Sequence, residues 1–304
     1  MLLYKKNART KNDALPTVSQ KTLNNIDDVD NELLRSIEKG TLKKLVIAYD
    51  LDRTEKRHSP FLRICQITDR IDFDIEFAPG VTSIDSLFEG CWLTSLPKTM
   101  DISRIRNVNR MFKDSFIVTP PLDLDLKKAE DLTGMFRKAL IYAPLNINAP
   151  SAESMSEMFK MADIGEKITF SPETRPTDVH EMFAGARIHA STDLDLKKAE
   201  NLTGMFKGAF IDVPLNINAP SAKSMSEMFK MADIGEKITF SPETRPANVH
   251  EMFENAKGYL PNVDDLPAMY RQKEYERREA ELQKHRSFKK MAICALTIFA
   301  CPGP

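Results

Sequence analysis

The chain has 304 residues, of which 29% are charged, and a formal net charge of −1 at pH 7. This length suits one large or two ordinary domains, and the near-neutral charge argues against a nucleic-acid partner bound through a basic surface. The four cysteines are widely spaced and form no CxxC pair, so we expect neither a disulfide framework nor a zinc knuckle, and a reducing compartment fits them better.

The chain begins with a polar stretch, residues 1–18, that we expect to be disordered. It lacks the apolar core of a Sec signal peptide. Residues 19–75 are predicted to form an N-terminal cap. Apolar residues at helical spacing over 19–39 predict a helix that ends at Gly40. A strand is predicted from Lys43 (KKLVIAYDLD), and FDIEF from Phe73 predicts a first ladder strand.

Residues 76–260 are an array of about eight repeats, each marked by a phenylalanine that methionine usually precedes. The marker phenylalanines are separated by 23 or 24 residues: Phe88, Phe112, Phe136, Phe159, Phe183, Phe206, Phe229 and Phe253. Residues 144–176 recur almost unchanged as residues 214–246, and the one difference is Lys223 in place of Glu153. A block of three repeats has therefore been duplicated.

Each repeat is predicted to contain a short helix around its marker phenylalanine, which we number position 0. Apolar or small residues at positions −4, −1, 0 and +3 have the spacing of one helix face. Position −5 is always Ser, Asn or Asp, which are favoured N-caps. Glutamate at position −2 could complete a capping box: Glu157, Glu181, Glu227 and Glu251.

Short alternating segments between these helices predict one strand per repeat: LDLDL from Leu122, LNINA from Leu145 and ITFS from Ile168, with copies in the duplicated block. Neighbouring strands should stack in parallel. The predicted fold is an α/β repeat solenoid, leucine-rich-repeat-like, with about eight units of 23–24 residues, each a short strand plus a short helix, and with helical caps.

The segments SAESMSEMFKMA and PTDVHEMFAGA resemble the BspA-like leucine-rich repeats of bacterial surface proteins, which carry an MFxxC/A signature. The resemblance covers roughly residues 75 to 260. It implies a leucine-rich-repeat-like solenoid used for adhesion or protein binding, without catalysis. The chain departs from that family in its slightly shorter units, in the stretch before each helix and in lacking a signal peptide.

The C-terminal region, residues 261–304, combines a charged helix (RQKEYERREAELQKHRSFKK) with an apolar tail (MAICALTIFACPGP). The apolar run is about half the ~20 residues of a membrane-spanning helix. The tail could fold back as a cap or pair with another chain. Alternatively, residues 271–304 could make a peripheral membrane contact.

No catalytic motif is recognisable, and we expect no enzymatic activity, no cofactor and no metal. His180 and His250 occupy the same repeat position. Stacked strands would place them roughly 14 Å apart, too far to share a metal. The alternative is an enzyme or membrane-targeted effector with its activity in the terminal regions, where His58 and Cys65 lie.

The predicted function is therefore that of a non-catalytic protein-binding scaffold, adhesin-like or a secreted or injected bacterial effector. We expect a cytoplasmic chain or one exported without a cleaved signal, and a cell-surface location fits less well. The predicted partner-binding residues face outward on the strands. They are Asp123, Asp125, Asn146, Asn148, Thr169, Ser171, Asp193, Asp195, Asn216, Asn218, Thr239 and Ser241.

Overall fold

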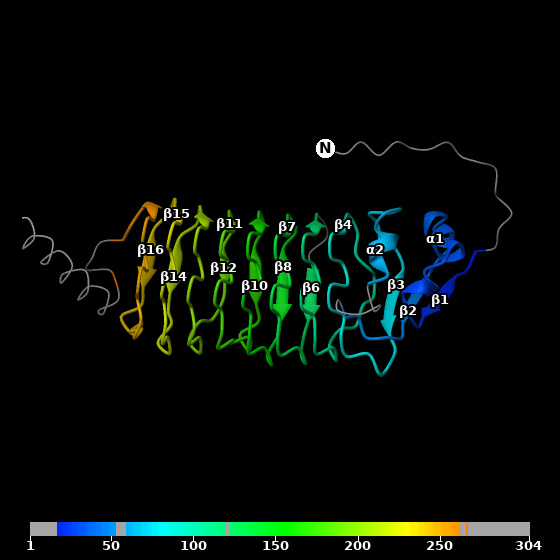
Figure 1. Cartoon of the computed structure of the whole chain (residues 1–304), viewed down its shortest axis with the longest axis horizontal. Helices are drawn as coiled ribbons and strands as arrows, with labels where there is room; N and C mark the ends of the chain where they lie inside the picture. The colour runs from blue at the N-terminus through cyan, green and yellow to red at the C-terminus, as the bar shows by residue number, and fades with distance from the viewer. Residues whose placement is uncertain (1–16, 53–58, 119–121, 262–265, 267–304) are drawn as a thin grey trace, which may run out of the picture.

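The computed structural model describes residues 17–52, 59–118, 122–261 and 266, and the fold is a parallel β-solenoid with little helix. Each repeat forms one coil, and the coils stack along the long axis of the molecule (Figure 1). The predicted repeat solenoid is confirmed. The predicted unit of one strand plus one helix is wrong, because α-helix among the described residues is confined to two segments before the first repeat.

The N-terminal part contains a parallel sheet of three strands, β1 (Gln20–Leu23), β2 (Lys44–Ile47) and β3 (Asp74–Phe77). Between the strands lie η1 (Ile26–Asp28), α1 (Asn31–Glu38) and α2 (Phe61–Ile64). The helix predicted over 19–39 is shorter, because β1 and η1 occupy its first half. Gly40 follows it with a φ of 66°, as a helix stop requires. Residues 1–16, most of the segment predicted to be disordered, lie outside the described residues.

The predicted strands form one face of the solenoid, seen at mid-height in Figure 1. β6 (Leu122–Asp125), β8 (Leu145–Asn148), β10 (Ile168–Phe170) and β12 (Thr192–Asp193) make one parallel sheet. β14 (Leu215–Ile217) and β16 (Ile238–Phe240) form a separate parallel pair. Parallel stacking is thus confirmed, but the ladder is interrupted between β12 and β14.

A second ladder that the sequence did not suggest runs along the upper edge in Figure 1. Its eight parallel strands have two residues each, the first facing outward and the second, except in the last strand, buried in the core. They are β4 (Trp92–Leu93), β5 (Phe116–Ile117), β7 (Leu140–Ile141), β9 (Asp163–Ile164), β11 (Arg187–Ile188), β13 (Phe210–Ile211), β15 (Asp233–Ile234) and β17 (Lys257–Gly258). We call this the edge ladder.

The segment predicted to be helical, positions −5 to +3, is a series of tight turns. In the coil of Phe136, the amides of Met135, Arg137 and Ala139 donate to carbonyls three residues earlier, at 3.0–3.2 Å. Positions −2 and +2 have positive φ in every coil, for example 63° at Gly134 and 60° at Lys138. Two left-handed residues in nine cannot belong to an α-helix. We call this nine-residue stretch the turn segment.

The remaining amides of the turn segment bond to the next coil, which explains why no helix forms. Gly134 N donates to Ser156 O at 3.0 Å, and Phe136 N donates to Met158 O at 2.8 Å. An isolated two-turn helix is unstable in water. In the turn segment, local hydrogen bonds alternate with bonds to the next coil, so that every second amide donates to a carbonyl of that coil. The apolar positions −4, −1, 0 and +3 still point inward, so the periodicity that predicted a helix serves this conformation equally well.

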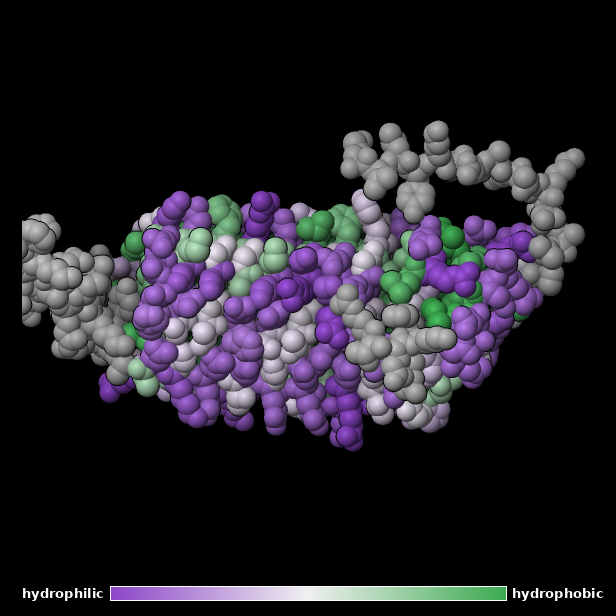
Figure 2. Space-filling view, in the orientation of Figure 1, coloured by the Kyte–Doolittle hydropathy of each residue, from purple (hydrophilic) through white to green (hydrophobic). Residues whose placement is uncertain are grey.

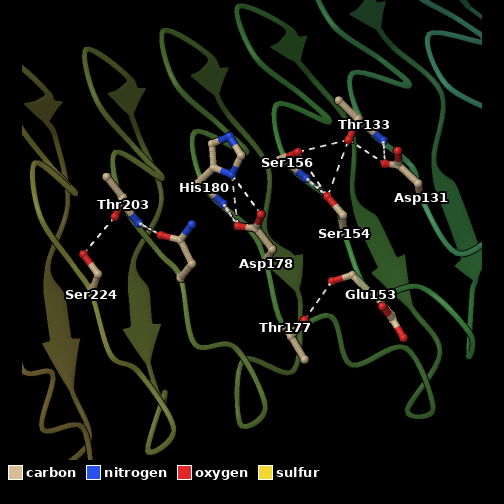
Figure 3. Close-up of polar contacts among 11 residues, drawn as sticks. Asp131, Thr133, Glu153, Ser154, Ser156, Thr177, Asp178, His180, Thr203 and Ser224 are labelled. Atoms are coloured by element: carbon tan, nitrogen blue, oxygen red, sulfur yellow. Dashed lines mark hydrogen bonds and ion pairs between the residues drawn. The ribbon is translucent and has the colours of Figure 1, made fainter.

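The residues predicted as N-caps accept hydrogen bonds, but at the start of a turn. Asp131 Oδ1 accepts from Thr133 N at 2.9 Å, and Asp178 Oδ1 accepts from His180 N at 3.1 Å (Figure 3). Each position −5 residue also pairs in parallel with its equivalent in the next coil. Short side chains that bond to the backbone two residues on favour turns as well as N-caps. The predicted capping-box glutamates are wrong, since all four have positive φ.

The marker phenylalanines form one continuous stack through the core. Phe136, Phe159 and Phe183 are almost wholly buried, with neighbouring ring centroids 5.2–5.3 Å apart and planes within 5° of parallel. Such regular stacking requires every coil to hold the same register. The near-constant spacing of the marker phenylalanines, 23 or 24 residues in each of the seven steps, makes this common register possible.

Ion pairs outside the core reinforce this register. A basic side chain at position +1 pairs with the position −2 glutamate of the next coil, as in Arg137–Glu157 at 2.8 Å and Lys207–Glu227 at 2.6 Å. Lys160 pairs with Glu181 in the same way and holds the pKa of that carboxyl below its usual value. These glutamates therefore connect coils rather than cap helices.

Two of the cysteines are joined. Cys65 follows α2 and Cys91 lies in the first coil, with their Cα atoms 5.5 Å apart and their sulfurs bonded. The sequence predicts no disulfide framework, yet one disulfide forms, because the two residues are distant in sequence but meet where α2 covers the first coil. Cys294 and Cys301 lie outside the described residues.

Candidate binding surfaces

The predicted partner-binding residues of the first three strands lie side by side and bond to one another. Asn146 Nδ2 donates to Asp123 Oδ1 at 2.6 Å, and Asn148 Nδ2 donates to Asp125 Oδ1 at 3.0 Å. Ser171 Oγ continues the row by donating to Asn148 Oδ1 at 2.9 Å. Since these polar groups already have partners, the row stabilises the sheet even without a ligand.

This row borders a shallow groove of about 260 Å³. Six predicted residues line the groove together with Leu124 and Ile147: Asp123, Asp125, Asn146, Asn148, Thr169 and Ser171. We call it the polar groove. It is the only part of the predicted site that the described structure brings together as one concave surface.

The six residues of the duplicated block do not repeat this arrangement. Asp193 lies in β12, and Asp195 pairs with Arg175 at 3.2 Å. Thr239 Oγ1 donates to Asn216 Oδ1 at 3.4 Å. Asn218 Oδ1 is buried without a hydrogen-bond partner, and Ser241 Oγ accepts from Glu243 N at 3.3 Å instead.

One of several substitutions between the two blocks lies in the strand next to the interruption. Leu122 fills an inward position of β6 and is 5% exposed, whereas Thr192 occupies the matching position of β12. A threonine buries less apolar surface and leaves a hydroxyl to be satisfied, so the strand is held less firmly against the core. Its ladder to β14 does not form, and the polar surface is not simply lengthened by the duplication.

Sequence reasoning missed an exposed apolar surface at the start of the edge ladder. Trp92 and Phe116 have ring centroids 4.7 Å apart, and Phe116 and Tyr142 are 5.9 Å apart. Trp92 is 59% exposed, Tyr142 45% and Leu140 41%. We call these four residues the aromatic patch. Figure 2 shows separate apolar patches between hydrophilic ones along the same upper edge.

A glycine makes room for the far side of the aromatic patch. A Cβ on Gly165 would lie 2.7 Å from Cδ1 of Tyr142, so any larger residue would displace the ring. The signal in the sequence is a pair of apolar residues at the same place in three successive repeats: WL at Trp92, FI at Phe116 and LI at Leu140. The second residue of each pair is buried. The exposure of the first residue in each pair could be predicted only if the pairs were known to be strands, because a strand places successive side chains on opposite faces.

Beyond the aromatic patch, the outward side chains of the edge ladder are polar except for Phe210, and polar side chains such as His189 and Asp212 follow its strands. His189 Nδ1 lies 3.1 Å from Asp212 Oδ2, and His189 Nε2 lies 3.9 Å from Asp163 Oδ1. His180, on the turn side, contacts Asp178 at 3.0 Å, and His250 lies 3.2 Å from Glu251. No group of three or more metal-ligating side chains occurs in the part of the chain that the structure describes.

No helix among residues 17–52, 59–118 and 122–261 is long and apolar enough to cross a membrane. The predicted C-terminal helix and apolar tail, and His58 of the alternative enzyme hypothesis, lie outside the described residues. Cys65 of that hypothesis is bonded to Cys91.

A family model described as "Mycoplasma protein of unknown function, DUF285" matches residues 73–171 and 177–290. These two ranges take in the coils with all eight marker phenylalanines and cover more than half of the chain. No curated protein and no solved structure matches this chain.

Proposed function

This chain belongs to DUF285, a family of Mycoplasma proteins of unknown function, and from its own surfaces we propose that it is a non-catalytic scaffold that binds a protein partner through the aromatic patch. The repeat solenoid provides a rigid, extended surface, as repeat proteins generally do. A partner that docks on a pre-ordered surface avoids much of the ordering cost of binding.

The observation that carries this proposal is the exposure of the aromatic patch. Trp92 and Tyr142 are about half exposed, yet their neighbours in the edge ladder hold them in place. Contiguous apolar surface of this kind marks interaction sites. Tryptophan and tyrosine are also the residues on which binding energy most often concentrates.

The polar groove is a second place at which a partner could bind. Its asparagines and aspartates satisfy one another, so a ligand there must replace existing hydrogen bonds. The aromatic patch requires no such exchange. We therefore assign the main contact to the patch and a supporting contact to the groove.

The BspA-like signature supports the same class of function, since that family is used in adhesion and protein binding. An exported or injected effector role is part of the proposal, as is a peripheral membrane contact through residues 271–304.

The test is capture of partners from host-cell and bacterial lysates by the immobilised full chain. We expect the double substitution Trp92→Ser/Tyr142→Ser to weaken the affinity for specific partners on the order of 1000-fold and so to abolish their retention, because each hot-spot side chain contributes on the order of 2 kcal/mol. Both residues are about half exposed, so the loss of their buried surface should lower the thermal unfolding midpoint by only a few degrees and leave the chain folded.

Asn146→Ala/Asn148→Ala is the matched control, since it alters the polar groove and leaves the patch intact. It should reduce retention far less. Loss of retention in this control, with normal retention by the patch variant, would move the binding site to the groove. Equal retention of partners by the unchanged chain and both variants would show that neither the aromatic patch nor the polar groove is the binding site.

A further inference from the structure

The segment Ser59–Cys65 takes the place of a missing coil at the N-terminal end of the phenylalanine stack. Phe61 is fully buried and its ring centroid lies 4.6 Å from that of Phe88, where the rings of a further coil would otherwise stack. In the repeats, the carbonyl at position −1 accepts from the phenylalanine amide of the preceding coil, as Met111 O accepts from Phe88 N at 2.7 Å. In the first coil, Leu87 O accepts from the Ser59 hydroxyl instead.

This segment has few of the inter-coil bonds that hold the other coils. Its amides bond locally, with Cys65 N donating to Phe61 O at 2.9 Å and Ile64 N donating to Pro60 O at 3.2 Å. Leu62 is 47% exposed, so one side of the short helix does not pack. The covalent tie to the first coil is the bond between Cys65 and Cys91, 26 residues apart in sequence.

We infer that the Cys65–Cys91 disulfide is a redox-sensitive latch that holds α2 over the end of the phenylalanine stack. A disulfide that closes a loop of this length restricts the open state strongly. Once the bond is reduced, α2 is held by the Ser59 contact, by the hydrogen bond from Arg63 Nη1 to Val29 O and by the packing of Phe61 and Ile64. The end of the core then opens far more often. This inference does not depend on the proposed binding function.

The two sulfurs differ in access, which determines how the latch opens. Cys91 is 2% exposed and Cys65 is half-buried, so a dithiol reductant attacks Cys65 Sγ. The S–S bond breaks, Cys91 leaves as a thiolate and takes up a proton, and a mixed disulfide forms on Cys65. The second thiol of the reductant closes its own disulfide and releases Cys65 as a thiol. The protein gains two electrons and two protons, which the reductant loses. The disulfide should therefore persist in an oxidising environment and be reduced in a reducing one.

The test uses the full chain, purified without reductant. Peptide mapping by mass spectrometry should find Cys65 linked to Cys91. Adding dithiothreitol should then increase hydrogen exchange at the amides of Ile64 and Cys65 on the order of 100-fold. Exchange in the central coils, for example at the amide of Phe159, should not change.

Two variants make the result specific. Cys294→Ser/Cys301→Ser should respond to dithiothreitol as the unchanged chain does. Cys65→Ala/Cys91→Ala should exchange rapidly at Ile64 with and without reductant. Free thiols at 65 and 91, a link from either of them to another cysteine, or a linked pair whose reduction leaves exchange at Ile64 unchanged would each overturn the inference. Since mapping needs no substitution, the test stands even if a variant does not fold.

Discussion

Alanine at Phe159 is expected to lower the free energy of unfolding by about 3–5 kcal/mol, the range for removing a buried aromatic ring. Phe159 is fully buried between Phe136 and Phe183, with ring centroids 5.2 and 5.3 Å away. Its loss removes both stacking contacts and leaves a cavity in the middle of the array, where neighbouring coils cannot collapse without losing register. Urea denaturation followed by circular dichroism measures the change.

Phe210→Ala is the matched control for this prediction. Phe210 faces outward on the edge ladder and is 38% exposed, so its removal should cost far less, about 1 kcal/mol. An equal loss in the two variants would show that the phenylalanine stack is not the main source of stability.

Proline at position 181 is expected to cost about 3 kcal/mol or more, whereas glycine there should change stability by no more than about 1 kcal/mol. Glu181 has a φ of 50°, which proline cannot adopt, and its amide donates to Thr203 O at 2.9 Å. Glycine adopts this φ freely, and Gly134 and Gly204 already occupy the same position in other coils. The glycine variant loses only the ion pair to Lys160.

The pair of substitutions separates the turn segment from the helix that the sequence suggested. In the predicted helix, residue 181 would lie in the first turn, where amides have no partner within the helix and proline costs little. In the turn segment, proline removes the bond from Glu181 N to Thr203 O and cannot adopt the positive φ. Thermal unfolding of Glu181→Gly and Glu181→Pro, compared with the unchanged chain, measures both effects. Similar losses for glycine and proline would contradict the left-handed conformation.

The strands on the groove face were predictable because alternation in LDLDL and LNINA has one interpretation, a half-buried strand. The turn segments were not, because inward positions at −4, −1, 0 and +3 arise from a helix and from turns alike. What distinguishes them is the positive φ at positions −2 and +2, where Gly134 and Gly204 are informative but Glu157 and Glu181 conceal the pattern. Glutamate there suggested a capping box, which the contact with the next coil replaces.

The candidate surfaces were predictable only in part. Asn146 and Asn148 were placed on the outward face because each strand's alternation determines it. The break between β12 and β14 could not be predicted, because TDLDL from Thr192 alternates in the same way as LDLDL from Leu122. The aromatic patch depends on the edge ladder, whose strands of two residues are too short for periodicity to detect.

Fluorescence of Trp92 tests the central claim most directly, because it is the only tryptophan of the chain and lies in the aromatic patch. In the free protein, we expect emission typical of a solvent-exposed indole and efficient quenching by acrylamide. Adding a captured partner should shift the emission to shorter wavelength and protect it from quenching, with the same dependence on partner concentration as binding itself. Binding that leaves the emission and quenching of Trp92 unchanged would contradict a partner seated on the aromatic patch.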